Sequence, residues 1–308
     1  MLLLRCAARS ARARPLRASY GVVVTCSSPP ANRAFGTSAA DATRNAADVR
    51  DLLRTRLSLT DAEVDKVVRF RPVGARATVE PKLQWLQTRL DLDAAQRGKM
   101  VLRLPPLLSK SVESMDSRLD WLQRRLGLDE AGLRKMVLSL PSLFNYSVED
   151  NLAPTLEWLQ TRLDLDDAGL RKIVVTCPQL LGFSVEDNLE PKLDWLQKRL
   201  DLDEAQLKKV VLMLPSLFNY SVEDNLAPKL DFLAREIGLS RAELRDWVVK
   251  VSSLLGRSLA NCYRPRLEAC RAAGVDERRV LSYANNSDGF FCKYTGIEPE
   301  DLAAIRQR

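Results

Sequence analysis

Apolar residues recur along this chain with helical spacing, and the pattern itself repeats every 36 or 37 residues. In the segment 191–227, Leu193, Leu196 and Leu200 lie three or four positions apart, which places them on one face of an α-helix. The same point of five segments carries an aromatic residue, at Trp85, Trp121, Trp158, Trp195 and Phe232. Because a fixed period of this length is typical of stacked repeat proteins, the sequence predicts an all-α helical-repeat solenoid.

Two proline columns predict where the helices of each unit begin and end. The first column precedes the leucine face and comprises Pro81, Ser117, Pro154, Pro191, Pro228 and Pro265. The second comprises Pro105, Pro141, Pro178 and Pro215, with Ser252 at the next place. Proline is tolerated in the first turn of a helix but breaks its interior. We therefore expect a first helix over 191–200 and a second helix that ends at Leu214.

Polar residues at the start of each second helix predict its cap. The side chain of Asp203 can accept hydrogen bonds from free N–H groups while Gln206 reaches back, which is a capping box. The same box is expected at Asp93/Gln96, Thr60/Glu63 and Ser240/Glu243, whereas Gly132 and Gly169 deprive Asp129 and Asp166 of the partner. Residues 216–225 are too few and too polar for a third full helix, so we predict a single 3₁₀ or α turn capped by Ser221.

These elements predict about six units of two helices and a short turn, stacked into a right- or left-curved solenoid. We expect the aromatic column to pack between units, in preference to stacking on nucleic-acid bases. The predicted divisions are a leader at 1–40, a linker at 41–48, units near 49–80, 81–116, 117–153, 154–190, 191–227 and 228–264, and a C-terminal cap at 265–308. The atypical last segment indicates a capped monomer.

The charge of the chain is uneven along its length. The formal net charge is +7, but residues 1–40 hold six Arg and no acid, which leaves 41 basic against 40 acidic residues elsewhere. Basicity alone therefore does not argue for a nucleic-acid partner. An Arg-rich, Ser- and Ala-rich, acid-free leader is typical of a mitochondrial transit peptide, and Arg33 stands three residues before Gly36 as at a matrix-protease site. A plastid presequence is the alternative.

Several classes of chemistry lack the residues they need. The chain contains no histidine, which excludes Ser-His-Asp and Cys-His catalysis and His-ligated zinc. Outside the leader, Cys177, Cys262, Cys270 and Cys292 show no CxxC spacing and are expected to be reduced and mostly buried. There is no glycine-rich nucleotide loop and no apolar run long enough for a membrane span. We predict no enzymatic activity, no cofactor or metal, no small-molecule substrate and no membrane partner.

The repeat resembles the signature of the mitochondrial transcription termination factor (mTERF) family. The resemblance rests on the run from Pro178 to Leu196, PQLLGFSVEDNLEPKLDWL, which recurs after Pro141 and Pro215, and on Tyr263–Leu267 and Ser287–Tyr294 near the end. It covers about residues 49–295. It implies an organellar protein of helix–helix–short-helix units in a half-superhelix that binds nucleic acid along a basic groove. Members of the family act in transcription termination, transcription initiation or rRNA handling.

Three columns of basic residues are candidates for phosphate contact. The first follows the proline column and comprises Lys82, Arg118, Lys192, Lys229 and Arg266, at the positive end of the first helix. The second lies two turns further along the same face and comprises Arg89, Arg125, Arg162 and Arg199. A third, weaker candidate comprises Lys99, Lys135, Lys172 and Lys209 on the second helix. Thr155 interrupts the first column and Glu236 the second. Pairing with nearby acids, or a merely solvated face, is the alternative for all of them.

The sequence leaves the class of partner open. Double-stranded DNA is the first expectation and organellar RNA the second. The near-neutral charge outside the leader and the repeated acidic pairs, such as Glu149-Asp150, favour another class of function. That alternative is a protein-binding solenoid, or an rRNA-binding ribosome-assembly factor, that recruits a partner enzyme through its concave face.

Overall fold

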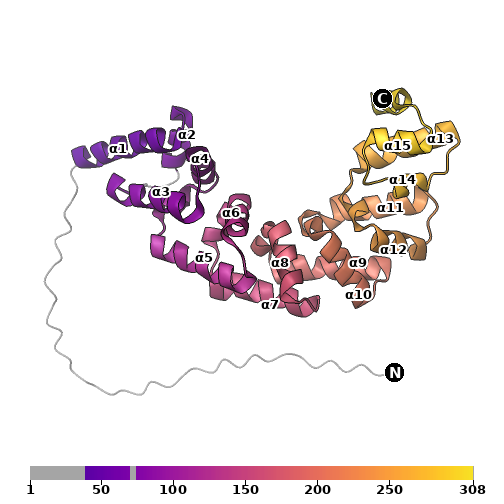
Figure 1. The fold of residues 1–308 in the computed structure, drawn as a ribbon, viewed down its shortest axis with the longest axis horizontal. Coiled ribbons are helices and arrows are strands. Elements are labelled where there is room, and N and C mark those ends of the chain that lie inside the picture. The colour runs from indigo at the N-terminus through magenta and orange to yellow at the C-terminus, as the bar shows by residue number, and fades with distance from the viewer. Residues whose placement is uncertain (1–38, 70–73, 308) are drawn as a thin grey trace, which may run out of the picture. The chain divides into compact units, whose positions relative to one another are not determined.

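The computed structural model describes residues 39–69 and 74–307, and all regular structure within them is helical (Figure 1). Sixteen α-helices alternate with nine short 3₁₀ or π segments over this described part, and no strand occurs in it. Thr43–Arg308 forms one compact unit that holds all the repeats. The predicted all-α helical-repeat fold is confirmed, whereas residues 1–38 of the predicted leader lie outside the described residues.

Each repeat contributes a first helix, here called an A helix, and a second, here called a B helix. The A helices are α1 (Ala39–Leu57), α3 (Arg76–Leu90), α5 (Val112–Leu126), α7 (Ala153–Arg162), α9 (Glu190–Leu200), α11 (Ala227–Glu236) and α13 (Arg264–Ala273). The B helices are α2 (Asp61–Arg69), α4 (Ala94–Arg103), α6 (Glu130–Ser139), α8 (Asp167–Thr176), α10 (Glu204–Met213) and α12 (Arg241–Lys250). After α13 follow α14 (Arg279–Ser282), α15 (Asp288–Thr295) and α16 (Pro299–Gln307).

Most units contain two short segments between their helices where the sequence predicted one. The 3₁₀ turns are η1 (Pro105–Ser109), η2 (Pro141–Asn145), η4 (Pro178–Gly182), η6 (Pro215–Asn219) and η8 (Ser252–Gly256). The π turns are η3 (Val148–Leu152), η5 (Val185–Leu189), η7 (Val222–Leu226) and η9 (Leu259–Tyr263), and each runs directly into the next A helix.

The π turns accommodate the prolines of the first proline column. A proline ring clashes with the carbonyl four residues earlier, and a wider turn with bonds over five residues relieves that crowding. Where Ser117 replaces proline, α5 is a regular α-helix without a π turn. Pro81 is the exception, since it lies inside α3. The continuous helical segment formed by η5 and α9 therefore begins after the N-cap residue Ser184, ahead of the predicted start at Pro191.

The predicted caps of the B helices are confirmed. The Gln206 N–H donates to the Asp203 carboxylate at 2.7 Å, and the Asp203 N–H donates to the Gln206 side chain at 3.1 Å. Complete boxes also form at Asp93 and Ser240. Asp129 accepts from the backbone of Gly132 alone, as expected for a cap without its partner. Each cap of this kind stabilises a helix by about 1 kcal/mol.

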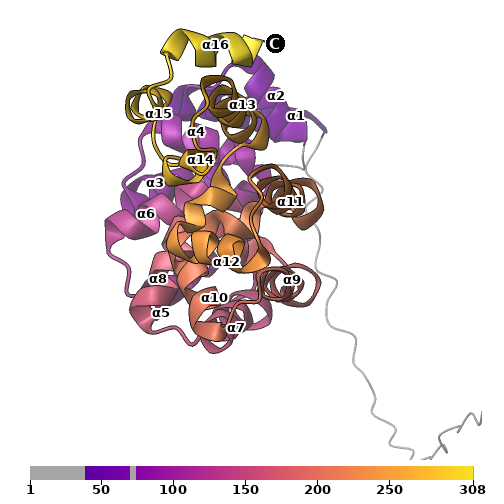
Figure 2. The ribbon, with the colours of Figure 1, turned by 90° about the vertical axis from the view of Figure 1, so that its right-hand side faces the viewer.

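Neighbouring units share one continuous apolar core. It runs from Val49 to Leu302 and takes in Leu193, Leu196 and Leu200, which are fully buried. A helices pack on the B helix of the next unit, as in α5–α8 and α9–α12, while B helices contact one another in α6–α8, α8–α10 and α10–α12. The 3₁₀ turns η2, η4, η6 and η8 also touch in succession. Figure 2 shows α9 and α11 on one side of α10 and α12.

The aromatic column packs between units, as predicted. Trp158 is half-buried, and its indole N–H donates to Glu190 at the start of the next A helix, at 2.6 Å. The Trp85 indole N–H similarly donates to Asp116, at 3.3 Å. The polar edge of these two rings is thus satisfied by the start of the next A helix, while the rings pack against the core.

Candidate nucleic-acid interface

The first basic column lies inside the repeat and ties the A helices α3, α5, α9 and α11 to the 3₁₀ turns of their own units. The Lys192 ammonium donates to the Phe218 carbonyl at 2.6 Å and to the Asn188 side chain at 3.2 Å. The same bond, to the carbonyl 26 residues on, joins Lys82 to Leu108 (2.5 Å), Arg118 to Phe144 (3.1 Å) and Lys229 to Leu255. In the last repeat Arg266 donates to the carbonyls of Tyr283 (2.8 Å) and Asn286 (2.7 Å).

Burial confirms how far these cations are from solvent. Lys192, Lys229 and Arg266 are 6%, 3% and 3% exposed. Desolvation lowers the pKa of Lys82 and Lys192, and lowers that of Lys229 to about 8. The placement therefore does not support the prediction that Lys82, Arg118, Lys192, Lys229 and Arg266 contact phosphate, because internal carbonyls engage their donors. It favours a packing role for this column.

The second column joins each unit to the next through carboxylates. Arg162 binds Glu190 at 2.9 Å and Asp194 at 3.3 Å on α9, and Glu204 at 2.9 Å on α10. Arg89 makes the equivalent contacts with Asp116 (3.0 Å), Asp120 (2.9 Å) and Glu130 (2.9 Å), Arg125 lies 3.6 Å from Asp167, and Arg199 pairs with Asp231. Acids occupy these side chains, so the placement of Arg89, Arg125, Arg162 and Arg199 again favours packing over phosphate contact.

The apparent break in the second column preserves the same joint. Glu236 stands where the other units carry arginine, and Arg271 of the next repeat supplies the cation at 3.2 Å. The charges are exchanged but the pair between units remains. This compensation supports a structural role for the column.

The third column remains free at the surface. Lys99, Lys135, Lys172 and Lys209 lie on α4, α6, α8 and α10, and all are exposed. Their ammonium groups make no hydrogen bond or ion pair with any residue that the structure describes. We call these four residues the lysine row.

Each lysine of the lysine row is followed in sequence by a stretch without acidic residues. From each lysine to the end of the following 3₁₀ turn, over 99–109, 135–145, 172–182 and 209–219, there is no Asp or Glu. The acids in the first turns of the B helices, Glu130 and Glu204 among them, are engaged by the second column. Since α6, α8 and α10 contact in succession and Arg103 of α4 donates to the Leu138 carbonyl of α6 at 3.4 Å, the lysines follow one another on adjoining helices.

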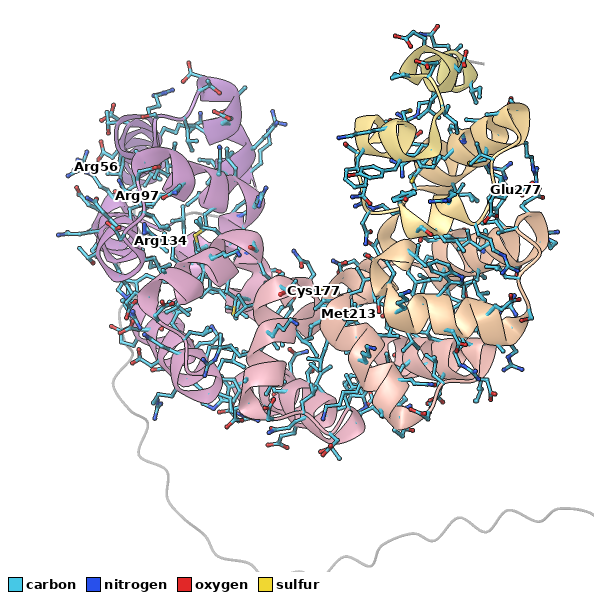
Figure 3. All side chains as sticks on the ribbon, turned by 45° about the vertical axis from the view of Figure 1, so that its right-hand side comes forward. Arg56, Arg97, Arg134, Cys177, Met213 and Glu277 are labelled. Atoms are coloured by element: carbon cyan, nitrogen blue, oxygen red, sulfur yellow. The ribbon has the colours of Figure 1, made fainter. Side chains whose placement is uncertain are left out.

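Before three of the four lysines, Lys135, Lys172 and Lys209, stands a second basic residue with a different task that the sequence pattern did not reveal. Arg134, labelled in Figure 3, donates to the carbonyl and the carboxylate of Asp91 at the end of α3, both at 2.9 Å. Arg171 donates to the Leu126 carbonyl of α5 at 2.6 Å, and Lys208 to the carbonyl of Asp164. A cation at the C-terminus of a helix satisfies free carbonyls and opposes the helix dipole. In each of these three basic pairs, therefore, the first residue caps the end of an A helix of the preceding unit and the second is exposed to solvent.

The chemistry available at this surface is electrostatic. The described residues contain no group of three metal-ligating side chains, and Cys177, Cys262, Cys270 and Cys292 are free thiols. Burial raises the pKa of Cys177 and raises that of Cys270 to about 11, so neither thiol is activated as a nucleophile. Within the described part, no helix has the length and apolar character needed to cross a bilayer.

The fold and this surface define a class: an all-α helical-repeat protein with a row of free lysines on its B helices. The sequence model of the mTERF family matches residues 51–285, and the chain belongs to that family. The resemblance seen in the proline and Ser-Val-Glu-Asp positions is thereby confirmed. The family consists of organellar nucleic-acid-binding proteins of helical-repeat architecture. The chain matches no curated protein.

Proposed function

We propose that this protein binds double-stranded nucleic acid in an organelle through the lysine row and acts there in transcription termination or in the regulation of organellar gene expression. The observation that carries the proposal is the row itself: four exposed ammonium groups at equivalent places in successive units, none of them engaged by a described residue. Membership of the mTERF family supports it at the level of the class of function.

The small net charge outside the leader is compatible with this proposal. Many carboxylates are already engaged by the second column or by helix caps, as Glu190 and Asp203 are. Phosphate binding depends on the local field of a surface and not on the total charge of the chain. The acid-free stretches that follow each lysine favour such a field.

Salt dependence of duplex binding tests the proposal. Neutralising four phosphates of B-DNA gives a slope of log K against log salt concentration of about −4. We expect the full chain to show a slope of at least this steepness in a fluorescence anisotropy titration. Lys172→Ala should make the slope less steep by about 1 and weaken binding to different duplex sequences to a similar degree.

Lys198→Ala is the matched control. Lys198 is also an exposed lysine, with 81% of its side chain accessible, but it lies on the A helix α9 beside Asp194. Its loss is expected to leave the slope unchanged. A slope near zero for the unaltered chain, together with a protein partner retained after nuclease treatment, would favour the protein-binding solenoid instead.

Two further measurements address the site of action and the kind of nucleic acid. We propose that residues 1–40 direct import, and a fluorescent reporter fused behind them is expected to enter mitochondria; entry into plastids alone would contradict that assignment.

Parallel titrations with DNA and RNA duplexes of one sequence test the preference for DNA. Tighter binding of the RNA would move the proposal toward rRNA handling.

A further inference from the structure

Three aromatic rings gather at the surface of the C-terminal cap. Phe290 and Tyr294 on α15 stack with ring centres 4.3 Å apart, and each lies 5.9 Å from Tyr283, which follows α14. Phe290 is 37% and Tyr294 49% exposed. Apart from Met213, they are the only exposed large hydrophobic residues in the part of the chain that the structure describes. Rings that served only to fill the core would be covered.

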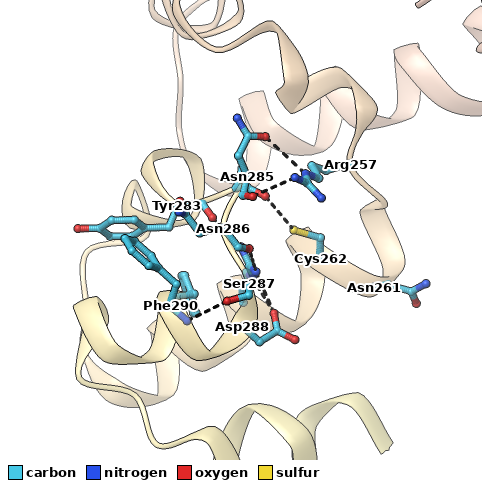
Figure 4. Close-up of polar contacts among 12 residues, drawn as sticks. Arg257, Asn261, Cys262, Tyr283, Asn285, Asn286, Ser287, Asp288 and Phe290 are labelled. Atoms are coloured by element: carbon cyan, nitrogen blue, oxygen red, sulfur yellow. Dashed lines mark hydrogen bonds and ion pairs between the residues drawn. The ribbon is translucent and has the colours of Figure 1, made fainter. Parts of the chain in front are cut away.

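The backbone beneath the rings is held against the last 3₁₀ turn. The Asn285 amide donates to the Ser253 hydroxyl of η8 at 2.5 Å. Figure 4 shows the neighbouring bond, in which Arg257 donates to the Asn285 carbonyl at 3.0 Å. Ser287 caps α15 by accepting from the Phe290 N–H at 3.3 Å. Because η8 continues the succession η2, η4 and η6, the rings lie on a segment that adjoins the end of that row of turns.

Positive charge borders the ring cluster. The Arg279 guanidinium donates to the Tyr283 hydroxyl at 3.1 Å, and the Lys293 ammonium lies 5.6 Å from the centre of the Tyr294 ring. The acid at the start of α15, Asp288, is neutralised by Arg266 at 2.9 Å and by Arg306 at 2.5 Å. An exposed aromatic surface flanked by cations is complementary to a nucleotide, whose base presents a π face and whose phosphate is negative.

We propose that Tyr283, Phe290 and Tyr294 stack on an unpaired base next to the bound duplex, with Lys293 and Arg279 near its phosphate. This inference rests on the proposed function, since it adds a single-strand contact to a duplex site. Stacking needs no particular base, because every base has a π face. The cluster therefore recognises a junction between double and single strands and not a sequence.

Duplexes with and without a short single-stranded overhang test the inference. The overhang carries 2-aminopurine, whose fluorescence falls when it stacks, and both 5′ and 3′ overhangs are used. We expect the full chain to bind one overhang duplex about tenfold more tightly than the blunt duplex and to quench the probe. Tyr294→Ala should remove that advantage and the quenching while leaving blunt-duplex affinity and its salt slope unchanged.

Two conservative variants separate stacking from general apolar contact. Tyr294→Phe keeps the ring and is expected to keep the overhang preference, whereas Phe290→Leu keeps apolar bulk without a ring and should lose most of it. Full overhang preference in Phe290→Leu would overturn stacking in favour of a hydrophobic protein contact. Equal affinity for blunt and overhang duplexes, without quenching, would also overturn it and leave duplex binding intact. Absence of binding to every nucleic acid would instead refute the proposed function, and the inference with it.

Discussion

The ammonium group of Lys229 makes the stability of this protein depend on pH in a defined window. It is 3% exposed, donates to the Asn225 side chain at 2.8 Å and to the Leu255 carbonyl, and lies 5.5 Å from the centre of the Tyr220 ring. Desolvation lowers its pKa from 10.5 to about 8. That difference corresponds to about 3 kcal/mol by which folding disfavours the charged form.

The sign follows from the protons bound in each state. Below pH 8 the lysine is charged in both the folded and the unfolded chain, so its contribution is constant and unfavourable. Between about pH 8 and pH 10.5 the unfolded chain binds more protons, and stability therefore rises with pH. Relative to Lys229→Met, which has no charge to titrate, the unaltered chain should gain about 2 kcal/mol between pH 8 and pH 10.

Urea unfolding at several pH values measures this gain as a difference between the two proteins. Other titrations cancel in that difference because both chains share them. Lys198→Met is the control: its side chain is 81% exposed, so folding changes its solvation little and the difference should stay flat. If the free energies of unfolding of Lys229→Met and the unaltered chain run parallel from pH 8 to pH 10, the desolvation argument is refuted.

Three further predictions concern the joints between units. Arg162→Met leaves three carboxylates without their cation and should lower the free energy of unfolding, measured by urea titration, by about 1–3 kcal/mol. Arg124→Met is the control, because Arg124 is exposed and has no carboxylate partner among the described residues; it should change the free energy of unfolding by less than about 0.5 kcal/mol. Trp158→Ala removes an inter-unit ring and should cost about 3–5 kcal/mol by thermal or urea unfolding; a fully stable variant would contradict its packing role. Ser184→Ala removes the cap ahead of α9 and should cost about 1 kcal/mol, and an unchanged urea midpoint would show that the π turn does not depend on it.

Local signals in the sequence predicted the architecture well and the roles of its charges poorly. Helical spacing, caps and proline positions act within a few residues, so the ranges of α9 and α10 follow from them closely. The sequence pattern did not predict the π turns. They relieve a steric clash between the proline ring and the preceding helical turn, and a pattern of residue types does not display that clash. Whether a lysine is buried depends on where the chain returns: the acceptor of Lys192 comes from a turn 26 residues later.

A usable signal for the free lysines was nevertheless present in the sequence. The basic columns differ in their surroundings, since the first two stand near Glu and Asp at fixed repeat positions while Lys135 and its equivalents open stretches without acids. The division of labour within pairs such as Arg134-Lys135 was not visible, because both residues are exposed to the same sequence context. Only the position of the preceding A helix decides which of them reaches a carbonyl.

The ion pair between units, with the arginine on one side and carboxylates on the other, bears on how repeats can be added to the chain. Except at the Glu236–Arg271 pair, where the charges are exchanged, a unit contributes the arginine to its successor and carboxylates to its predecessor, as Arg162 and Glu190 do. A tandem duplication of one 37-residue segment would carry both the arginine and the carboxylates of this ion pair. The added unit could therefore form the pair with the unit on either side of it without a compensating mutation. Each such copy would also add one exposed ammonium group to the lysine row, so the surface available to a polyanion would lengthen with the number of repeats.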